Sequence, residues 1–411
     1  MNAAAASERS WGLLPAGVEP AARWILVSRG LRGFCDGFVA MLLPAYLLAL
    51  GLGVVEVGVL STITLAGSAA ATLMLGAFGH RWPARRLLLC AAGLMTATGI
   101  GFAGFASFWP LAVVAFVGTL NPSSGDVSVF LPIEHAELAR AARPNHVRTA
   151  LFARYSLAGS LCAAFGALAA GIPSLLVAHA GWTLDHALRG MFLLYAGVGV
   201  VVWVVYRRLS ALPMEAVEVT APLGPSRAVV IRLAALFCVD SFAGGLLVNA
   251  LLALWLFERF GMSLAAAGGF FFWAGLLTTA SQLLAPAVAR RIGLLNTMVF
   301  THIPASLLLI LAALVPNLPL ALACLLLRSA LSQMDVPTRS AFVVSVVTPA
   351  ERAAAASFTA VPRSLASAIG PSIGGALLAS GMLAAPLLAC GGLKIAYDLA
   401  LLYVFRNHRI E

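Results

Sequence analysis

The stretch FCDGF (Phe34 to Phe38) places an aspartate inside a long apolar run, and FCVDSF (Phe237 to Phe242) does the same further along the chain. The two aspartates, Asp36 and Asp240, are 204 positions apart. A charged side chain is costly inside an apolar segment that lies in a membrane. Two such residues in similar surroundings therefore indicate an internal repeat. Each carboxylate is expected to have a structural or functional role.

A second pair of segments supports the repeat. SGDVSVF (Ser124 to Phe130) aligns with QMDVPTR (Gln333 to Arg339) at an offset of 209 residues. The same offset, without a gap, places Arg154 on Arg363. Because residues that are rare in apolar runs keep their register, we expect the two halves of the chain to share one fold.

The composition indicates a membrane protein. Hydrophobic residues make up 61% of the chain and charged residues 10%, whereas soluble domains have about 25% charged residues. A spanning helix needs about 20 apolar residues, and strands of a membrane barrel would alternate apolar and polar residues, which these runs do not. The chain is therefore predicted to be an all-α polytopic membrane protein with twelve spans: 24–50, 55–79, 86–107, 109–134, 147–174, 187–206, 229–256, 264–288, 294–314, 317–343, 352–379 and 383–405.

The net charge of +10 comes almost entirely from arginine, and Lys394 is the only lysine. The arginines gather in alternate loops, so the positive-inside rule explains them better than nucleic-acid binding does. This pattern predicts that both termini are cytoplasmic in a multi-pass protein of the cell membrane. The expected parts are a cytoplasmic segment 1–23, a six-helix bundle 24–206, a cytoplasmic connector 207–228, a second six-helix bundle 229–405 and a cytoplasmic tail 406–411.

No pattern for enzyme chemistry or a cofactor stands out. The six cysteines fall inside apolar runs without a C-x-x-C pair, and the seven histidines are scattered. Neither a P-loop nor a metalloprotease or hydrolase motif occurs. We therefore expect no metal, no cofactor and no enzymatic activity, and a membrane enzyme is the weaker alternative.

The loop between the second and third spans resembles a motif of the major facilitator superfamily, G-x-x-x-D-R-x-G-R-(R/K). Gly76 and Arg81 match, and the pair Arg85 and Arg86 matches with a shift of one position. His80 stands where the family has aspartate, and Pro83 where it has the second glycine. The resemblance implies two pseudo-symmetric six-helix bundles and a secondary transporter that works by alternating access. It also implies that spans 1 and 7 line a central cavity.

Two acid–arginine pairs are expected at similar depth near the cytoplasmic side. Asp126 and Arg154 belong to spans 4 and 5, and Asp335 and Arg363 repeat them in spans 10 and 11. They are interpreted either as structural ion pairs or as a cytoplasmic gate, which the resemblance favours. Four further charges near the span ends could extend this cluster but are preferably interpreted as loop-edge charges in water: Glu134, Arg148, Arg339 and Arg352.

Asp36 and Asp240 lie about twelve residues inside their spans, which is near the membrane midplane at about 1.5 Å per residue. They are candidates for proton coupling or for binding a substrate in the central cavity. The alternative for Asp36 is neutralisation by Arg32, one turn earlier, and by the nearby Arg29. Asn121 and Asn249 are further candidates for the cavity wall.

In span 12, Lys394 and Asp398 are four residues apart and are expected to neutralise each other on one face. The preferred function is a monomeric, proton-coupled transporter of a small solute in the lipid bilayer, with efflux of an amphipathic or cationic compound. Uptake of an anionic metabolite and a non-transporting receptor or scaffold on the same fold stay open as alternatives.

Overall fold

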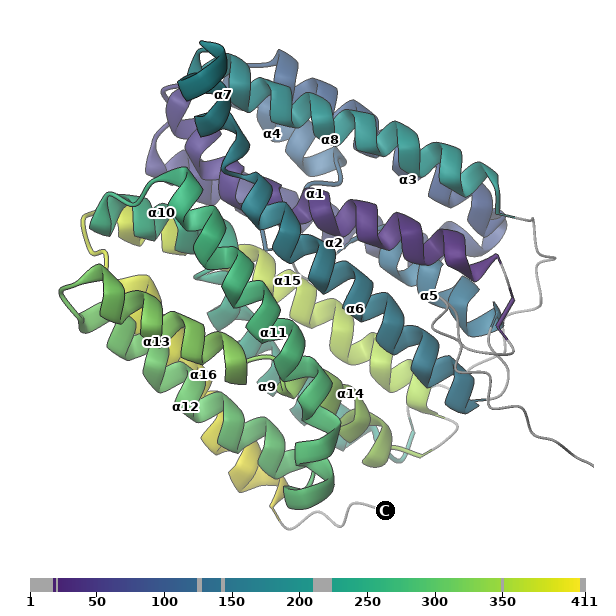
Figure 1. Cartoon of the computed structure of the whole chain (residues 1–411). Coiled ribbons are helices and arrows are strands. Elements are labelled where there is room, and N and C mark those ends of the chain that lie inside the picture. Colours follow the sequence, from purple (N-terminus) through teal and green to yellow (C-terminus); the bar gives the residue numbers. More distant parts are fainter. Residues whose placement is uncertain are drawn as a thin grey trace, which may run out of the picture.

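The computed structural model describes residues 18–19, 21–123, 128–141, 145–209, 224–348 and 351–406. Two groups of helices lie side by side, the first formed by α1 to α8 and the second by α9 to α16 (Figure 1). The elements are α1 Ala22–Ala49, α2 Val54–Phe78, the short 3-10 helix η1 Gly79–Arg81, α3 Ala84–Gly104, α4 Phe108–Val117, α5 Phe130–Ala141, α6 Asn145–Ala169, α7 Ile172–Ala180, α8 Leu184–Arg207, α9 Arg227–Gly245, α10 Asn249–Phe260, α11 Leu264–Ile292, α12 Leu294–Leu314, α13 Leu318–Leu331, α14 Asp335–Ser345, α15 Arg352–Ala379 and α16 Ala385–Phe405.

Within these ranges the helices join into twelve segments, which agrees with the predicted spans. Eight segments are single helices, and four consist of two helices in series: α4–α5, α6–α7, α9–α10 and α13–α14. By length and hydropathy alone, ten helical stretches of the described chain could cross a membrane. Gln333 and Met334 of the repeated sequence QMDV lie in the interruption between α13 and α14, and Asp335 begins α14. The aligned sequence SGDV lies outside the described residues.

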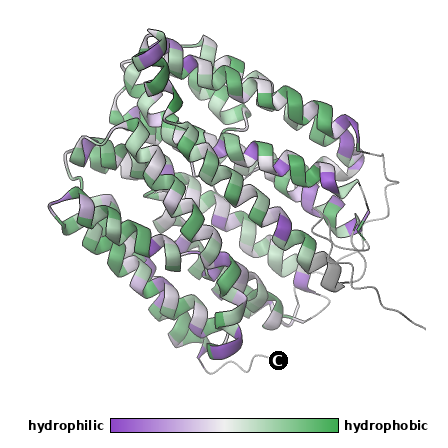
Figure 2. Ribbon diagram, viewed as in Figure 1, coloured by the Kyte–Doolittle hydropathy of each residue, from purple (hydrophilic) through white to green (hydrophobic). Residues whose placement is uncertain are grey.

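Large apolar side chains cover the outside of the bundle. Trp109 is 77% exposed and Val113 64%, both in α4, and Tyr403 of α16 is 73% exposed. Hydrophobic residues run along most of the helices, while hydrophilic ones are more frequent at their ends (Figure 2). Such a surface suits lipid, because soluble monomers rarely expose large contiguous apolar areas.

The packing repeats between the two halves. In the first half α1 packs along α6 and α3 along α8; in the second half α9 packs along α15 and α12 along α16. The halves meet through α2 against α15 and through α6 against α11, which are again equivalent pairs. This arrangement confirms the two pseudo-symmetric bundles predicted from the internal repeat.

Glycine lets α1 and α6 approach closely. A Cβ atom added to Gly37 would lie 2.0 Å from the backbone oxygen of Ala163, and one added to Gly33 would lie 2.5 Å from that of Gly159. The backbone oxygens cannot move aside as a flexible side chain would. Small residues at such positions allow the dispersion contacts that hold membrane helices together.

The two faces of the bundle differ in how the halves meet. We call the face where α1 begins and α16 ends the terminus side, and the opposite face the far side. The hydroxyl of Thr62 accepts hydrogen bonds from the backbone N–H of Ser372 at 2.9 Å and from its hydroxyl at 2.8 Å. Gly268 packs against the backbone of Ala167. These cross-bundle contacts lie in the far halves of α2, α15, α6 and α11, so the halves are closed against each other there.

On the terminus side, the start of α9 is attached to the loop before α15 by Glu351. Its carboxylate accepts hydrogen bonds from the backbone N–H of Gly224, from that of Ser226 at 3.3 Å and from the Thr348 hydroxyl at 2.8 Å. Hydrogen bonds from Ser226, Gly224 and Thr348 lower the pKa of Glu351 from 4.5 to about 2. The charged carboxylate therefore holds the end of the connector to the second bundle.

We predict that Gly37→Ala lowers stability, because even one methyl group would force α1 and α6 apart. Overpacking of this kind costs about 1–3 kcal/mol. Melting of the purified protein in detergent, followed by tryptophan fluorescence, measures the change. Gly93→Ala is the matched control, since a Cβ there meets nothing within 4 Å. Equal melting temperatures for the two variants would contradict the close-packing account.

We also predict a pH-dependent role for Glu351. Because its pKa is lower in the folded protein, the stabilisation is fully present above about pH 4.5 and is lost as the pH falls toward 2. Glu351→Gln should therefore melt at a lower temperature than wild type at pH 7, and the difference should shrink below pH 4.5. The exposed Glu258→Gln is the control. A difference that does not change with pH would rule out this assignment.

Candidate functional site

Six charged or titratable side chains meet inside the second bundle, and we call them the C-terminal charge cluster: Asp240, His302, Asp335, Arg339, Lys394 and Asp398. The Lys394 ammonium donates to the Asp240 carboxylate at 2.6 Å, and Arg339 lies 3.3 Å from the other oxygen of Asp240. Arg339 also pairs with Asp335. The cluster thus links α9, α14 and α16 through ion pairs.

His302 joins this cluster from α12. Its Nδ1 lies 3.0 Å from a carboxylate oxygen of Asp398, and its Nε2 lies 3.4 Å from the Lys394 ammonium and 3.9 Å from Asp240. Since lysine only donates, Nε2 accepts from Lys394 and Nδ1–H donates to Asp398 when the ring is neutral. The histidine therefore lies between two carboxylates and a lysine.

The cluster lies deep in the membrane segments. Lys394 is nine residues from the far-side start of α16, about 14 Å along the helix axis, and His302 is eight residues from the terminus-side start of α12, about 12 Å. The side chains of Asp240, His302 and Asp398 are at most 5% exposed. At this depth each charge needs a partner, because an isolated ion in hydrocarbon is very costly.

A smaller cluster lies in the first bundle, and we call it the N-terminal charge cluster: Arg32, Glu134, Tyr155 and Tyr206. Glu134 is 0% exposed, pairs with Arg32 and accepts hydrogen bonds from the Tyr155 and Tyr206 hydroxyls, both at 2.5 Å. The carboxylate thus has one cation and two neutral donors. This closed set of partners suits a fixed structural link between α1, α5, α6 and α8.

Asp36 lies one turn from Arg32 on α1 and is partly exposed. Arg29 and Arg32 are both close enough to interact with it electrostatically. Arg32, however, forms its ion pair with Glu134. Neutralisation of Asp36 by Arg29 and Arg32 together therefore stays open, although Arg32 is shared with Glu134.

The expectation that Lys394 and Asp398 neutralise each other is wrong. Lys394 instead reaches Asp240 on α9, and Asp398 pairs with His302 on α12. The two residues are one turn apart on α16, but each finds a better-placed partner on a neighbouring helix. Because both residues pair with other helices, α16, the predicted span 12, is part of the C-terminal charge cluster.

The interpretation of Glu134 and Arg339 as loop-edge charges in water is also wrong. Glu134 is fully buried, and the Arg339 side chain is 11% exposed. Both residues follow the interruptions in their segments, so α5 and α14 bring their charges inward. Arg352 is exposed as expected, whereas the side chain of Arg148 lies outside the described part.

The structure describes both members of only one of the two predicted gate pairs, Asp335 and Arg363. Asp126 lies outside the described residues, so its pairing with Arg154 stays a prediction. Between described residues, Asp335 is paired with Arg339, one turn along α14, and not with Arg363. Arg363 is instead close enough to Cys238 of α9 to interact with it.

Asn121 and Asn249 meet at a contact between the two halves. The Asn249 side chain donates to the backbone oxygen of Ser123 at 3.0 Å, and the N–H of Ala250 donates to the Pro122 oxygen at 3.1 Å. Asn121 accepts from the Ser123 N–H at 3.1 Å and from its hydroxyl at 2.7 Å, and is 2% exposed. These amides therefore support the interrupted backbone at the start of α10.

The loop after α2 contains η1. Arg81 stacks over Phe78 at 5.3 Å, and Arg85 donates to the backbone oxygen of Arg207 at 2.9 Å. Arg86 is exposed, and Gly76 has open space around it; the side chain of His80 lies outside the described part. Arg85 thus attaches the start of α3 to the end of α8 within one bundle.

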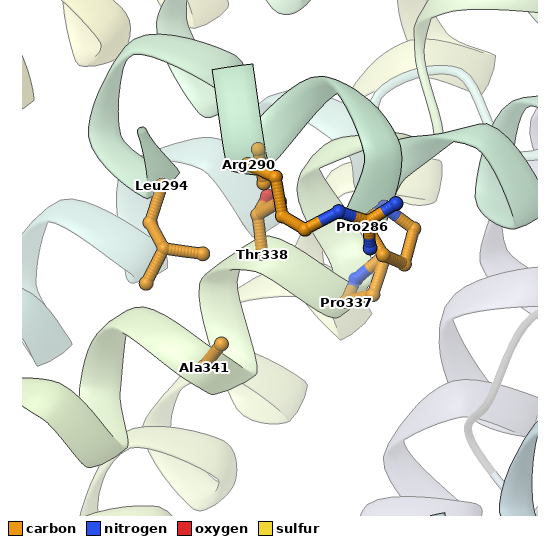
Figure 3. A pocket seen from close by; sticks show the side chains of 7 residues that line it. Pro286, Arg290, Leu294, Pro337, Thr338 and Ala341 are labelled. Atoms are coloured by element: carbon orange, nitrogen blue, oxygen red, sulfur yellow. The ribbon is translucent and has the colours of Figure 1, made fainter. Parts of the chain in front are cut away.

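A pocket of about 290 Å³ opens on the terminus side between α11, α12 and α14. Figure 3 shows Arg290 beside Pro286 and Pro337, with Thr338 and Ala341 on the neighbouring helix. Pro337 and Thr338 lie between Asp335 and Arg339 in the sequence. The pocket therefore adjoins the helix that brings two charges to the C-terminal charge cluster.

The sequence analysis missed His302, Tyr155 and Tyr206 as site residues. A histidine within a predicted span was the available signal for His302, since a polar side chain at that depth needs a partner. Tyrosines are common in membrane helices, so Tyr155 and Tyr206 gave no comparable signal. Among the described residues, no group of three or more acidic, histidine or cysteine side chains could hold a metal ion.

Comparisons with known proteins agree with this architecture. The chain is 26% identical over 411 aligned positions to the uncharacterized membrane protein YJR124C of Saccharomyces cerevisiae, covering 91% of this chain and 92% of the yeast protein. The nucleoside transporter NupG superposes with a TM-score of 0.71 at 15% identity, covering 94% of this chain and 100% of that structure. A D-xylose–proton symporter also gives 0.71, at 16% identity, covering 92% of this chain and 97% of that one.

The sequence profile of the Major Facilitator Superfamily matches residues 25–332. This range runs from the start of α1 to the break between α13 and α14, which is well over half of the chain. With the repeated six-segment bundles and the structural neighbours, the match assigns the chain to a family of transporters and not of enzymes: it belongs to the Major Facilitator Superfamily.

Proposed function

We propose that this transporter moves its small solute together with protons and that the C-terminal charge cluster is the coupling element. The observation that carries the proposal is the position of His302 between Asp398 and Lys394 deep in the membrane. Histidine is the side chain whose charge changes most readily near neutral pH. The four side chains of the N-terminal charge cluster include no histidine, and the nearby His135 packs edge-on against Tyr155 with ring centroids 5.2 Å apart.

The contacts of His302 suggest how a proton would change the cluster. In the neutral ring Nε2 accepts from Lys394, so a proton on Nε2 would remove that acceptor and place two cations 3.4 Å apart. The protonated Nε2 could then donate to Asp240, now 3.9 Å away. Lys394 would have to leave at least one of its two contacts. Protonation would thus change the link between α9, α12 and α16, as expected of a local electrostatic switch.

Alternating access would then open the far side. The closed cross-bundle contacts include the hydrogen bonds of Thr62 with Ser372. The terminus side is expected to face the cytoplasm of a cell membrane, because the arginine-rich loops lie there. On this proposal the structure corresponds to an inward-facing state of a monomer.

The partners of Asp240 bear on the charge of the substrate and on the direction of transport. Efflux of an amphipathic or cationic compound is the expectation from the midplane aspartates, but Asp240 already has two cationic partners. That occupancy favours the alternative, uptake of an anionic metabolite. A receptor or scaffold without transport would have no need for a titratable histidine in the cluster.

We predict that His302→Gln and Asp240→Asn lose solute-driven proton movement by at least tenfold. Wild-type and variant proteins are reconstituted in liposomes with an internal pH dye and tested with anionic, cationic and neutral solutes under an imposed pH gradient. The exposed His186→Gln and Asp185→Asn are matched controls. Solute transport without proton movement in the wild type, or full coupling in both variants, would contradict the proposal.

We also predict that a disulfide between the far halves stops transport. Thr62→Cys combined with Ser372→Cys places two thiols where the hydroxyls are 2.8 Å apart. Oxidation should form the bond, shown by mass spectrometry, and arrest transport until reduction restores it. Each single variant is the control. Undiminished transport by the fully cross-linked protein would show that this contact need not open.

A further inference from the structure

Arg328 is a cation in the middle of the second bundle. Among the residues that the structure describes, its side chain has no hydrogen-bond or ion-pair partner. It lies ten residues from the far-side start of α13, about 15 Å along the axis. This depth is near the midplane of a hydrocarbon core about 30 Å thick, so the guanidinium cannot reach either surface easily.

Arg328 lies on the buried face of α13. One turn along this face are Cys324 and Leu325, both at most 4% exposed, and Ala321 lies a further turn away at 0%. The exposed stripe of the same helix, Leu320 at 46% and Leu327 at 59%, lies on the other side. Arg328 itself is partly exposed.

Arg328 is adjacent to the C-terminal charge cluster. It interacts electrostatically with Cys390 on α16, which is one turn from Lys394 on the same helix. Lys394 in turn contacts His302. Cys390, the residue of α16 with which Arg328 interacts, therefore lies on the same face of α16 as Lys394.

Arg328 completes a balance of charge in this region. Three cations, Arg328, Arg339 and Lys394, accompany the carboxylates of Asp240, Asp335 and Asp398 when His302 is neutral. A proton on His302 would add one positive charge at a depth where net charge is costly. A monovalent anion at Arg328 would restore neutrality.

We propose that Arg328 binds a small organic monoanion and that His302 takes up one proton for each anion bound. The inference rests on the proposed coupling role of the C-terminal charge cluster and names the substrate class. The planar guanidinium suits a carboxylate, which it can hold through two parallel hydrogen bonds. Lys394, released from His302 by the proton, can supply a second cation to the same anion.

The surroundings of His302 support this exchange. The charged and titratable groups on the helices around it are Asp398, Lys394, Tyr397 and Cys390 of α16, Asp240 of α9, Arg328 and Cys324 of α13, and Asp335 and Arg339 of α14. α11 also packs on α12 but carries no charged residue before Arg290. Among the cations named here, Arg328 alone lacks an ion-pair or hydrogen-bond partner in the described structure. It is therefore where an added anion would be accepted.

Binding is tested first, by thermal stabilisation of the detergent-purified protein with sodium benzoate, salicylate, nicotinate and pyruvate at pH 6 and pH 8. At least one of these carboxylates should stabilise the wild type, more strongly at pH 6. Arg328→Gln should raise the concentration needed by at least tenfold, and Arg328→Lys should recover part of the loss. The exposed Arg232→Gln is the matched control.

Transport then tests the stoichiometry. One proton with one monoanion carries no net charge, so uptake of the active carboxylate into liposomes should not respond to a potassium-valinomycin potential. In His302→Gln any remaining anion flux should carry current and lose its dependence on pH. Potential-driven flux in the wild type, or unchanged anion binding in Arg328→Gln, would overturn the proposal.

The two proposals fail in different ways. If protons move with cationic or neutral solutes while none of the four carboxylates binds, the anion site at Arg328 is wrong and proton coupling stands. If a carboxylate binds through Arg328 but no solute moves protons, coupling is wrong. In that case the one-to-one exchange with His302 also falls, and Arg328 keeps only the role of an anion-binding residue.

Discussion

The contact between the Lys394 ammonium and the Asp240 carboxylate, 2.6 Å long and buried between α16 and α9, is the interaction on which the second bundle depends most. In hydrocarbon neither charge can be hydrated, so each must be matched by protein. Arg339 and His302 join the same carboxylate region from α14 and α12. Four segments are therefore held in register by one neutralisation requirement. If Lys394 or Asp240 is removed, the charge of the remaining residue stays buried and must be neutralised by another group.

The two halves solve this requirement differently although their helices repeat. In the first half Glu134 is saturated by one arginine and two tyrosine hydroxyls, none of which changes charge near neutral pH. In the second half a histidine shares a lysine and two aspartates. A pseudo-symmetric fold thus carries two charge clusters that are built differently. On the proposed function, a proton alters only the second of them.

The sequence predicted the fold well because its evidence was periodic. Apolar runs of spanning length, arginine-rich alternate loops and the aligned aspartates determined the segments and the two halves. The partners of the buried charges were predicted less well. The i,i+4 spacing of Lys394 and Asp398 suggested a pair, but the rotation of α16 turns them toward Asp240 and His302. Likewise, Glu134 lies near the end of a span, and only the interruption before α5 brings it inside. Contacts between helices depend on the rotation of each helix about its axis and on interruptions within the segments. Neither can be predicted from a single sequence.

The most direct test of the account is the protonation of His302 itself. Protein labelled with ¹⁵N-histidine and reconstituted in lipid gives imidazole signals by solid-state NMR, and the His302 signal is identified by its loss in His302→Gln. The account predicts that, at a pH at which a solute is transported, adding that solute changes the proportion of neutral and protonated imidazole in this signal. A His302 signal that is the same with and without the transported solute would contradict a coupling role for the C-terminal charge cluster.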